Sequence, residues 1–113
     1  MSMIREVPKR AWPQYFQAIS NVAAGTRAEI EVASLDLGDQ IASDWLPLIG
    51  LTYDTRNDLI DVALTGLNHL IRQPEQIEVT EDAGTIRSIA VRTRDGTLQM
   101  LRLKEPLQLP AAL

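Results

Sequence analysis

The fold is decided by residues 12–32, WPQYFQAISNVAAGTRAEIEV, in which the spacing of the apolar side chains changes from helical to alternating. Trp12, Phe16, Ile19 and Ala23 recur every three or four residues, so they share one face of an α-helix. The first part of this stretch therefore predicts an amphipathic helix.

Residues with distinct backbone preferences mark the two ends of this helix. Pro13 fits the first turn, because the N–H group that it lacks would have no helical partner there. Gly25 readily adopts the left-handed conformation that commonly ends a helix. We expect a helix over residues 11–24. Its polar face should point to water, with Gln14, Gln17, Ser20 and Asn21.

Beyond the helix the apolar period becomes two. Ala28, Ile30 and Val32 alternate with Glu29 and Glu31, a pattern typical of a strand with one buried and one charged face. Similar apolar segments predict further strands at 46–53, 59–64, 77–80, 85–93 and 97–103. We expect loops, turns or connections at 36–44, 54–58, 66–74 and 82–84.

The last two expected strands, 85–93 and 97–103, show a turn signal between them and a break in their apolar alternation. Asp95-Gly96 predicts a hairpin with a type I′ turn, which needs a positive φ at both central residues. The apolar phase slips by one residue within 85–93 and within 97–103, which indicates a β-bulge or a strand buried on both faces.

These elements predict one α+β domain over residues 1–113. One N-terminal helix is followed by a five- to six-stranded, strongly bent antiparallel sheet or small partly open β-barrel. The β region covers about residues 27–104, and an extended tail follows over 105–113. The residues expected in the core are Trp12, Phe16, Ile19, Ile30, Val32, Leu48, Ile60, Val62, Leu64, Ile77, Val79, Ile89 and Val91.

The composition excludes several functions. The chain has no cysteine, which excludes disulfides, thiolate zinc sites, iron–sulfur clusters and cysteine nucleophiles. No apolar run approaches the roughly 18 residues that span a bilayer, and residues 1–10 are charged rather than signal-like. The net charge of −4 argues against nucleic acid. We therefore expect a cytoplasmic protein without a cofactor, a membrane contact or a nucleic-acid partner.

His69 is the one histidine, and histidine is the usual general acid or base near neutral pH. A catalytic role would need a carboxylate or a nucleophile beside it, and Asp61, Thr65 and Asn68 are the nearest polar residues in sequence. The competing interpretation is a structural histidine that binds backbone. We expect no enzymatic activity, with a small-molecule or catalytic site at His69 as the alternative.

Two charged stretches are candidates for a metal site and for a nucleic-acid-binding face. Acids gather at Asp36, Asp39, Asp44, Asp54 and Asp58, but their spacing matches no calcium loop, so we expect no metal. Bases gather at Arg87, Arg92, Arg94, Arg102 and Lys104, as in a basic face of an Sm-like RNA-binding barrel. Such barrels stack bases on aromatic loop residues, and the turn at 94–97 has none. Nucleic-acid binding is therefore the weaker alternative.

The leading hypothesis is a non-enzymatic interaction module that binds itself, most simply as a two-fold dimer, or another protein. Acidic residues dominate 29–61 and basic residues dominate 87–104, so the two regions could face each other across a two-fold axis. A small open sheet also has unpaired edges. The residues that we expect at an interface are Trp45, Arg87, Arg92, Arg102, Leu107 and Leu109.

Motifs along nearly the whole chain resemble an uncharacterised bacterial family, a domain of unknown function. They are Arg5-Glu6-Val7-Pro8-Lys9 with Trp12 and Phe16, Glu31-Val32 with Asp36 and Gly38, Leu46-Pro47-Leu48-Ile49-Gly50-Leu51, His69, Pro74, Asp95-Gly96-Thr97, and Leu103-Lys104-Glu105-Pro106-Leu107 with Leu109-Pro110. The resemblance implies a stand-alone module and assigns no catalytic or binding residue.

Overall fold

The computed structural model describes the backbone of residues 2–23, 25–34, 36 and 38–108. Its elements are β1 (Ser2–Glu6), the 3-10 turn η1 (Lys9–Ala11), α1 (Trp12–Val22), β2 (Arg27–Ser34), β3 (Gly38–Asp54), β4 (Leu59–Leu64), β5 (Leu67–Arg72), β6 (Pro74–Asp82), β7 (Thr85–Thr93) and β8 (Leu98–Gln108). The strands form one antiparallel sheet in the order β1-β6-β7-β8-β2-β3-β4-β5.

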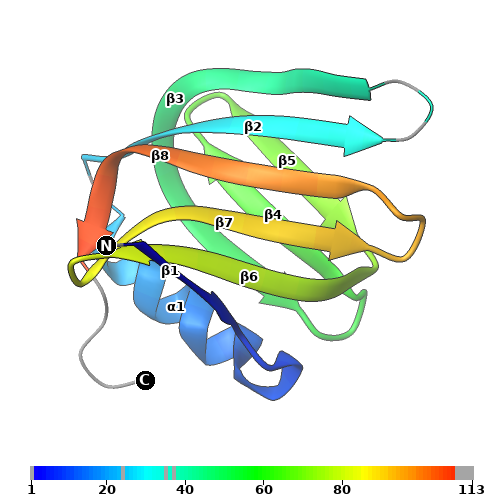
Figure 1. The fold of residues 1–113 in the computed structure, drawn as a ribbon, viewed down its shortest axis with the longest axis horizontal. Coiled ribbons are helices and arrows are strands. Elements are labelled where there is room, and N and C mark those ends of the chain that lie inside the picture. Colours follow the sequence, from blue (N-terminus) through cyan, green and yellow to red (C-terminus); the bar gives the residue numbers. More distant parts are fainter. Residues whose placement is uncertain (1, 24, 35, 37, 109–113) are drawn as a thin grey trace.

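The sheet folds over itself because β3 belongs to two layers. This strand is 17 residues long. Residues 38–47 pair with β2, and residues 48–54 turn away and pair with β4. Register shifts at Ala28–Glu31 of β2 and at Leu48–Gly50 of β3 allow the bend. Figure 1 shows β4 and β5 behind the strands β8 and β2, with α1 below them.

The bend leaves one edge of β3 without a neighbouring strand, and the segment from α1 to β2 covers it. The Leu48 amide donates to the Thr26 carbonyl over 2.8 Å. The Leu51 amide donates to Ser20 Oγ over 2.8 Å, and the Ser20 hydroxyl donates to the Leu51 carbonyl over 2.7 Å. The expectation that Ser20 faces water is therefore wrong. Its hydroxyl supplies the hydrogen bonds to Leu51 that a neighbouring strand would otherwise supply.

Gly50 permits this close contact between α1 and β3. A Cβ atom at Gly50 would lie 3.1 Å from Ser20 Oγ, which is closer than nearly all Cβ contacts. The glycine is therefore required for space rather than for an unusual backbone angle.

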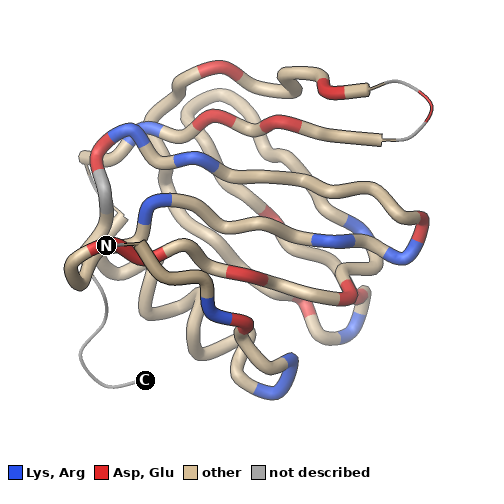
Figure 2. The backbone as a smooth tube through the Cα atoms, viewed as in Figure 1, with Lys and Arg blue, Asp and Glu red and all other residues tan. Residues whose placement is uncertain are grey.

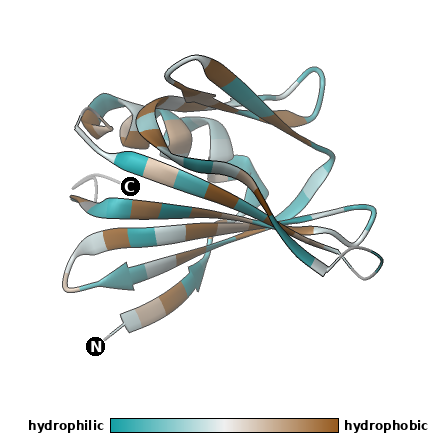
Figure 3. Ribbon diagram, turned by 90° about the horizontal axis from the view of Figure 1, so that it is seen from above, coloured by the Kyte–Doolittle hydropathy of each residue, from teal (hydrophilic) through white to brown (hydrophobic). Residues whose placement is uncertain are grey.

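The apolar face of α1 and the inner faces of the two layers form one core. Trp12 is 1% exposed, donates from its indole nitrogen to the Val7 carbonyl over 2.8 Å, and packs edge-on against Tyr53. All the predicted core residues are buried except Val32, which is half-buried. Figure 3 shows the apolar and polar residues alternating along the strands beside the helix. The helical and alternating periods are thus confirmed.

The expected number of strands was too low. Eight strands are described where five or six were expected, because residues 2–6 and 67–72 form two further strands, β1 and β5. Residues 38–44, expected as a loop, belong to β3, and residues 67–72 were expected as part of a connection. Both segments lack a clean apolar alternation, yet each completes a backbone ladder, with β2 and β4 respectively. The sheet has β1 and β5 as its edges, so it is strongly bent but not closed into a barrel.

The type I′ turn expected at Asp95-Gly96 is wrong, and the other hairpin turn of β7 is the one that fits this type. Gly96 has a φ of 86° but Asp95 has no positive φ, and the Gly96 amide donates to the Thr93 carbonyl, so this loop is a type I turn with a glycine bulge. Ala83 and Gly84 both have a positive φ, at 52° and 82°, which fits a type I′ turn. The 85–93 segment does contain a bulge: Thr80 and Glu81 of β6 pair with Ser88 and Ile86, so β7 has one extra residue between them.

The tail was expected not to continue the sheet, and this is wrong for residues 105–108. They complete β8, with Leu107 opposite Ile86 and 3% exposed. Leu107 is therefore a core residue rather than an exposed contact, whereas Leu109 lies outside the described residues. The one α-helix among the described residues is too short to cross a membrane.

The edge contact of β3 leads to a stability prediction. Ser20→Ala should lower the free energy of unfolding by about 1–3 kcal/mol, because it leaves the Leu51 amide and carbonyl without partners. Gln14→Ala, at an exposed position of the same helix, should change it by less than about 0.5 kcal/mol. Urea unfolding of both variants measures the difference. Equal effects of the two substitutions would contradict the edge-covering role of Ser20.

Candidate functional site

His69 lies on the edge strand β5, opposite Val62 of β4, and faces the interior of the bent sheet. It is half-buried, and its Nε2 lies 2.7 Å from Oε1 of Gln99 on β8. Because Oε1 only accepts hydrogen bonds, His69 Nε2 carries the proton. The bond joins the second layer to the first across the open side of the molecule.

A small apolar cavity lies next to this bond. Its walls come from α1 and both layers and include Phe16, Ile30, Leu51, Val62, Ile71, Ile89, Val91 and Leu101. Gln99 is the one polar side chain in the lining. The cavity volume of about 10 Å³ is at the lower limit for holding one water molecule.

The surroundings of His69 do not form a catalytic constellation among the described residues. Its hydrogen-bond partner among the described residues is the neutral amide of Gln99, and Asn68, its neighbour in sequence, donates instead to Asp61 over 2.8 Å. General acid–base chemistry needs a nucleophile or a carboxylate within hydrogen-bond reach of the imidazole. The geometry fits a bonded, structural histidine at the rim of an apolar cavity.

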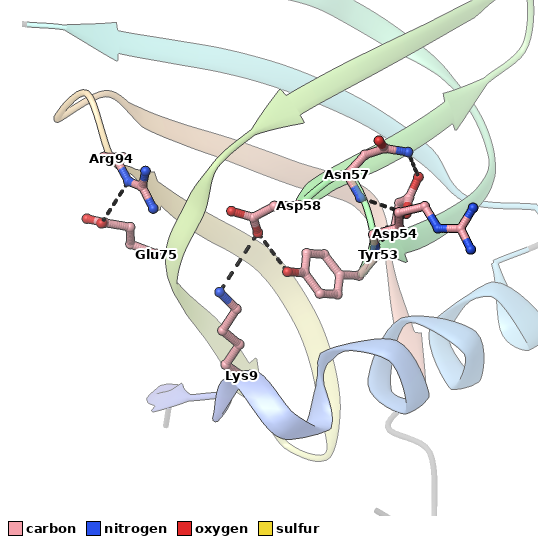
Figure 4. Close-up of polar contacts among 8 residues, drawn as sticks. Lys9, Tyr53, Asp54, Asn57, Asp58, Glu75 and Arg94 are labelled. Atoms are coloured by element: carbon pink, nitrogen blue, oxygen red, sulfur yellow. Dashed lines mark hydrogen bonds and ion pairs between the residues drawn. The ribbon is translucent and has the colours of Figure 1, made fainter.

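A polar cluster at the end of the sheet was not anticipated from the sequence. The Tyr53 hydroxyl donates to Asp58 Oδ1 over 2.7 Å, and Lys9 Nζ lies 3.8 Å from the same oxygen (Figure 4). Burial and the adjacent Asp58 carboxylate raise the pKa of Tyr53 to about 12. A phenol with this pKa is not a base near neutral pH, so the cluster fixes the β3–β4 turn onto η1.

The five acids considered for a metal are dispersed. Asp54 accepts from the Arg56 and Asn57 amides within its own turn, and Asp44 accepts from the Trp45 amide. Asp39 lies beside Glu31, whose carboxylate raises the pKa of Asp39. No group of three possible metal ligands occurs in the part of the chain that the structure describes.

Most bases of the 87–104 stretch are partnered within the chain. Arg102 forms ion pairs with Glu29 and Glu31 on the neighbouring β2. Arg87 lies 3.4 Å from Asp82, and Arg94 lies 3.7 Å from Glu75. Figure 2 shows basic residues interspersed with acidic ones over the sheet. Ion pairs within the chain thus describe these residues better than a basic face does.

Trp45 is half-buried rather than an exposed anchor. The ammonium group of Lys104 lies 5.7 Å from the centre of its ring, within the range of a cation–π contact.

The outer face of the strands β1-β6-β7-β8-β2-β3 has no covering element among the described residues. Helix α1 and the β4–β5 hairpin lie together on the opposite side (Figures 1 and 3). Strand alternation places Glu31, which is paired with Arg102, between Met100 and Ile41 on the bare side, and five apolar residues gather around it. These residues, the outer patch, are Ala33, Ile41, Ala90, Leu98 and Met100. Sequence reasoning missed this surface, although the apolar slip at Leu98 and Met100 was its signal.

Three charges beside the outer patch lack an opposite charge. Glu6 on β1 is directly opposite Glu78 on β6, and neither forms an ion pair with a described residue. Like charges at opposing positions of a sheet are destabilising. Arg92, two residues from Ala90 on β7, is exposed and also has no ion pair with a described residue.

The Tyr53–Asp58 contact leads to a prediction about pH. A phenol pKa raised from 10 to about 12 contributes stability that is complete below pH 10 and is lost as pH rises from 10 to 12. Tyr53→Phe should lower the free energy of unfolding by about 1–3 kcal/mol at pH 7, through loss of a hydrogen bond to a carboxylate. The difference from the unsubstituted protein should shrink between pH 10 and 12.

Tyr15→Phe is the matched control at pH 7, because Tyr15 is also buried but its hydroxyl has no hydrogen-bond partner among the described residues. It should cost less than about 0.5 kcal/mol at pH 7. Burial raises the pKa of Tyr15 as well, so the control is limited to pH 7, and urea unfolding up to pH 12 compares Tyr53→Phe with the unsubstituted protein. A Tyr53→Phe variant that parallels the unsubstituted protein up to pH 12 would refute the proposed contact.

Comparison with known proteins places the chain in a family. The model of a family of unknown function (DUF5335) matches residues 3–112. An uncharacterized protein of Aquifex aeolicus (strain VF5) is 34% identical over 107 residues, which cover 94% of this chain and 96% of that protein. No solved structure matches the chain. The chain therefore belongs to the family of unknown function DUF5335, as its motifs had indicated.

Proposed function

We propose that this protein is a non-enzymatic interaction module that associates with a second copy of itself through the outer face of its sheet. The observation that supports this proposal is the outer patch. It lies in the middle of a sheet face that no described element covers. Packing two such faces together, as in a β-sandwich, removes this surface from water.

The charges around the outer patch support a second copy as the partner. Glu6 and Glu78 lie on one side of Ala90 and Arg92 lies further along β7, and none of the three forms an ion pair within the part of the chain that the structure describes. A two-fold axis through the patch brings the surface of each copy against the same surface of the other. Arg92 of one copy can then neutralise the acidic pair of the other.

This proposal differs from the charge argument based on sequence alone. The sequence alone predicts that the whole acidic region 29–61 of one copy faces the whole basic region 87–104 of the other. Because Arg87, Arg94 and Arg102 have ion-pair partners within the chain, the proposal uses Arg92 and the Glu6–Glu78 pair instead.

Two isoleucines on β3 provide a matched test. Ile41 is 53% exposed in the outer patch, and Ile49 is 62% exposed on the same strand beyond the bend. Ile41→Lys should weaken the dimer by at least about tenfold, because it places an unpaired charge in the interface. Ile49→Lys should leave the dimer intact. Light scattering and analytical ultracentrifugation over a range of concentrations measure both.

Charge reversal tests the orientation of the two copies. Arg92→Glu should weaken association, and adding Glu78→Arg in the same chain should restore it. A monomer at all concentrations, or equal effects of Ile41→Lys and Ile49→Lys, would contradict the proposed interface.

A further inference from the structure

We infer that the free edge of β1 pairs with the same edge of a second copy, so that two sheets join into one continuous antiparallel sheet around a two-fold axis. This contact uses the rim of the sheet and not the outer patch. It therefore does not depend on the proposed face-to-face dimer. Where both contacts form, the edge contact links one dimer to the next.

The backbone of β1 presents unpaired groups on one side. Its neighbour is β6, and no described strand lies beyond it in the sheet (Figure 3). The Val7 amide donates to the Ile77 carbonyl over 2.9 Å, so these two residues form a hydrogen-bonded pair. Such pairs alternate along an antiparallel ladder, and the described β1–β6 register has no shift. The amide and carbonyl groups of Ser2, Ile4 and Glu6 therefore point away from β6, as the addition of a strand requires.

Exposed apolar side chains flank this edge. Ile4 is 67% exposed and Met3 is 63% exposed, more than any other large apolar residue that the structure describes. Successive side chains of a strand point to opposite faces, so one of them lies on each face of the sheet. On the other edge strand, β5, Leu67 and Leu70 are only 40% and 41% exposed. An exposed apolar edge strand is a typical place for pairing between chains, and β1 fits this description better than β5.

The charged residues of β1 do not block the edge. Arg5 Nη2 lies 2.9 Å from Glu81 Oε2, and Glu6 Oε1 accepts a hydrogen bond from the side-chain amide of Gln76 over 3.2 Å. Both partners lie on β6, so the charged groups are held over the sheet rather than beyond its edge. The strand also contains neither lysine nor proline, which often protect edge strands from pairing.

The order of residues in β1 favours a second copy as the partner. With a two-fold axis at Ile4, this residue lies opposite Ile4 of the other copy, Met3 faces Arg5, and Ser2 faces Glu6. All five residues of the strand are then paired, and no like charges face each other. An axis at Arg5 or Glu6 would place that residue opposite its own charge, which destabilises a sheet. An axis at Ser2 or Met3 would leave part of the strand unpaired.

A peptide with the sequence of β1, Ser-Met-Ile-Arg-Glu, acetylated and amidated, tests the backbone pairing directly. It is added to the full chain carrying Ile41→Lys, so that face-to-face association does not contribute. NMR should show saturable shifts centred on the amides of Ser2, Ile4 and Glu6. A peptide N-methylated at Ile4 lacks a donor that faces the edge and should bind at least about tenfold more weakly. N-methylation at Arg5, whose N–H group would point away from the edge, is the matched control and should have little effect.

Substitutions test the pairing of two whole copies. In the chain carrying Ile41→Lys, the amide signals of β1 should shift as the protein concentration rises from micromolar to millimolar. Ile4→Lys places two like charges opposite each other and should weaken this association by at least about tenfold. Ile49→Lys, at a residue 62% exposed on β3, is the control and should leave the association unchanged. Both side chains are exposed, and the spectra of dilute samples report whether each variant is folded.

Three results would overturn the inference: β1 amides that do not shift up to millimolar protein, equal binding of the two methylated peptides, or shifts centred on β5 instead of β1. The outer patch is tested separately. A contact of one five-residue strand is too small to persist at micromolar concentration, so light scattering there reports on the face-to-face dimer alone. Failure of either interface is thus distinguishable from failure of the other.

Discussion

The exchange of hydrogen bonds between Ser20 and the backbone of Leu51 holds the two layers of this protein in place. A strand that leaves its sheet exposes amide and carbonyl groups that must find other partners if they are to be buried. In β3 these partners are the hydroxyl of Ser20 and the carbonyl of Thr26. The absence of a side chain at Gly50 lets the helix approach closely enough for them to act.

The two faces of the sheet have different roles because of this bend. On the inner side, β3 carries β4 and β5 over the core and brings His69 to Gln99, 30 positions apart in sequence. On the outer side no covering element is described, so the outer patch is left to solvent or a partner. One structural constraint thus produces both an enclosed cavity and a bare apolar surface.

The sequence predicted the features that follow from local periodicity and missed those that depend on the bend. The Trp12–Ala23 spacing gave the helix, and alternation in β2, β4, β6 and β7 gave the core. Residues 38–44 and β5 have no such alternation, because hairpin arms and edge strands are held by backbone pairing rather than by burial of one face. His69 could be singled out as the one histidine, whereas nothing local connects it to Gln99. Ala83 at a positive φ likewise could not be expected, since alanine does not favour it.

The central claim is that α1 satisfies the open edge of β3, and the backbone amide of Leu51 reports on it directly. Hydrogen exchange measured residue by residue by NMR should find this amide protected about as strongly as the buried amides of the β3–β4 ladder, although no strand pairs with it on that side. The protection should fall selectively in Ser20→Ala. A Leu51 amide that exchanges as fast as amides in exposed turns would show that the helix does not cover this edge, and the bent two-layer arrangement described here would then be wrong.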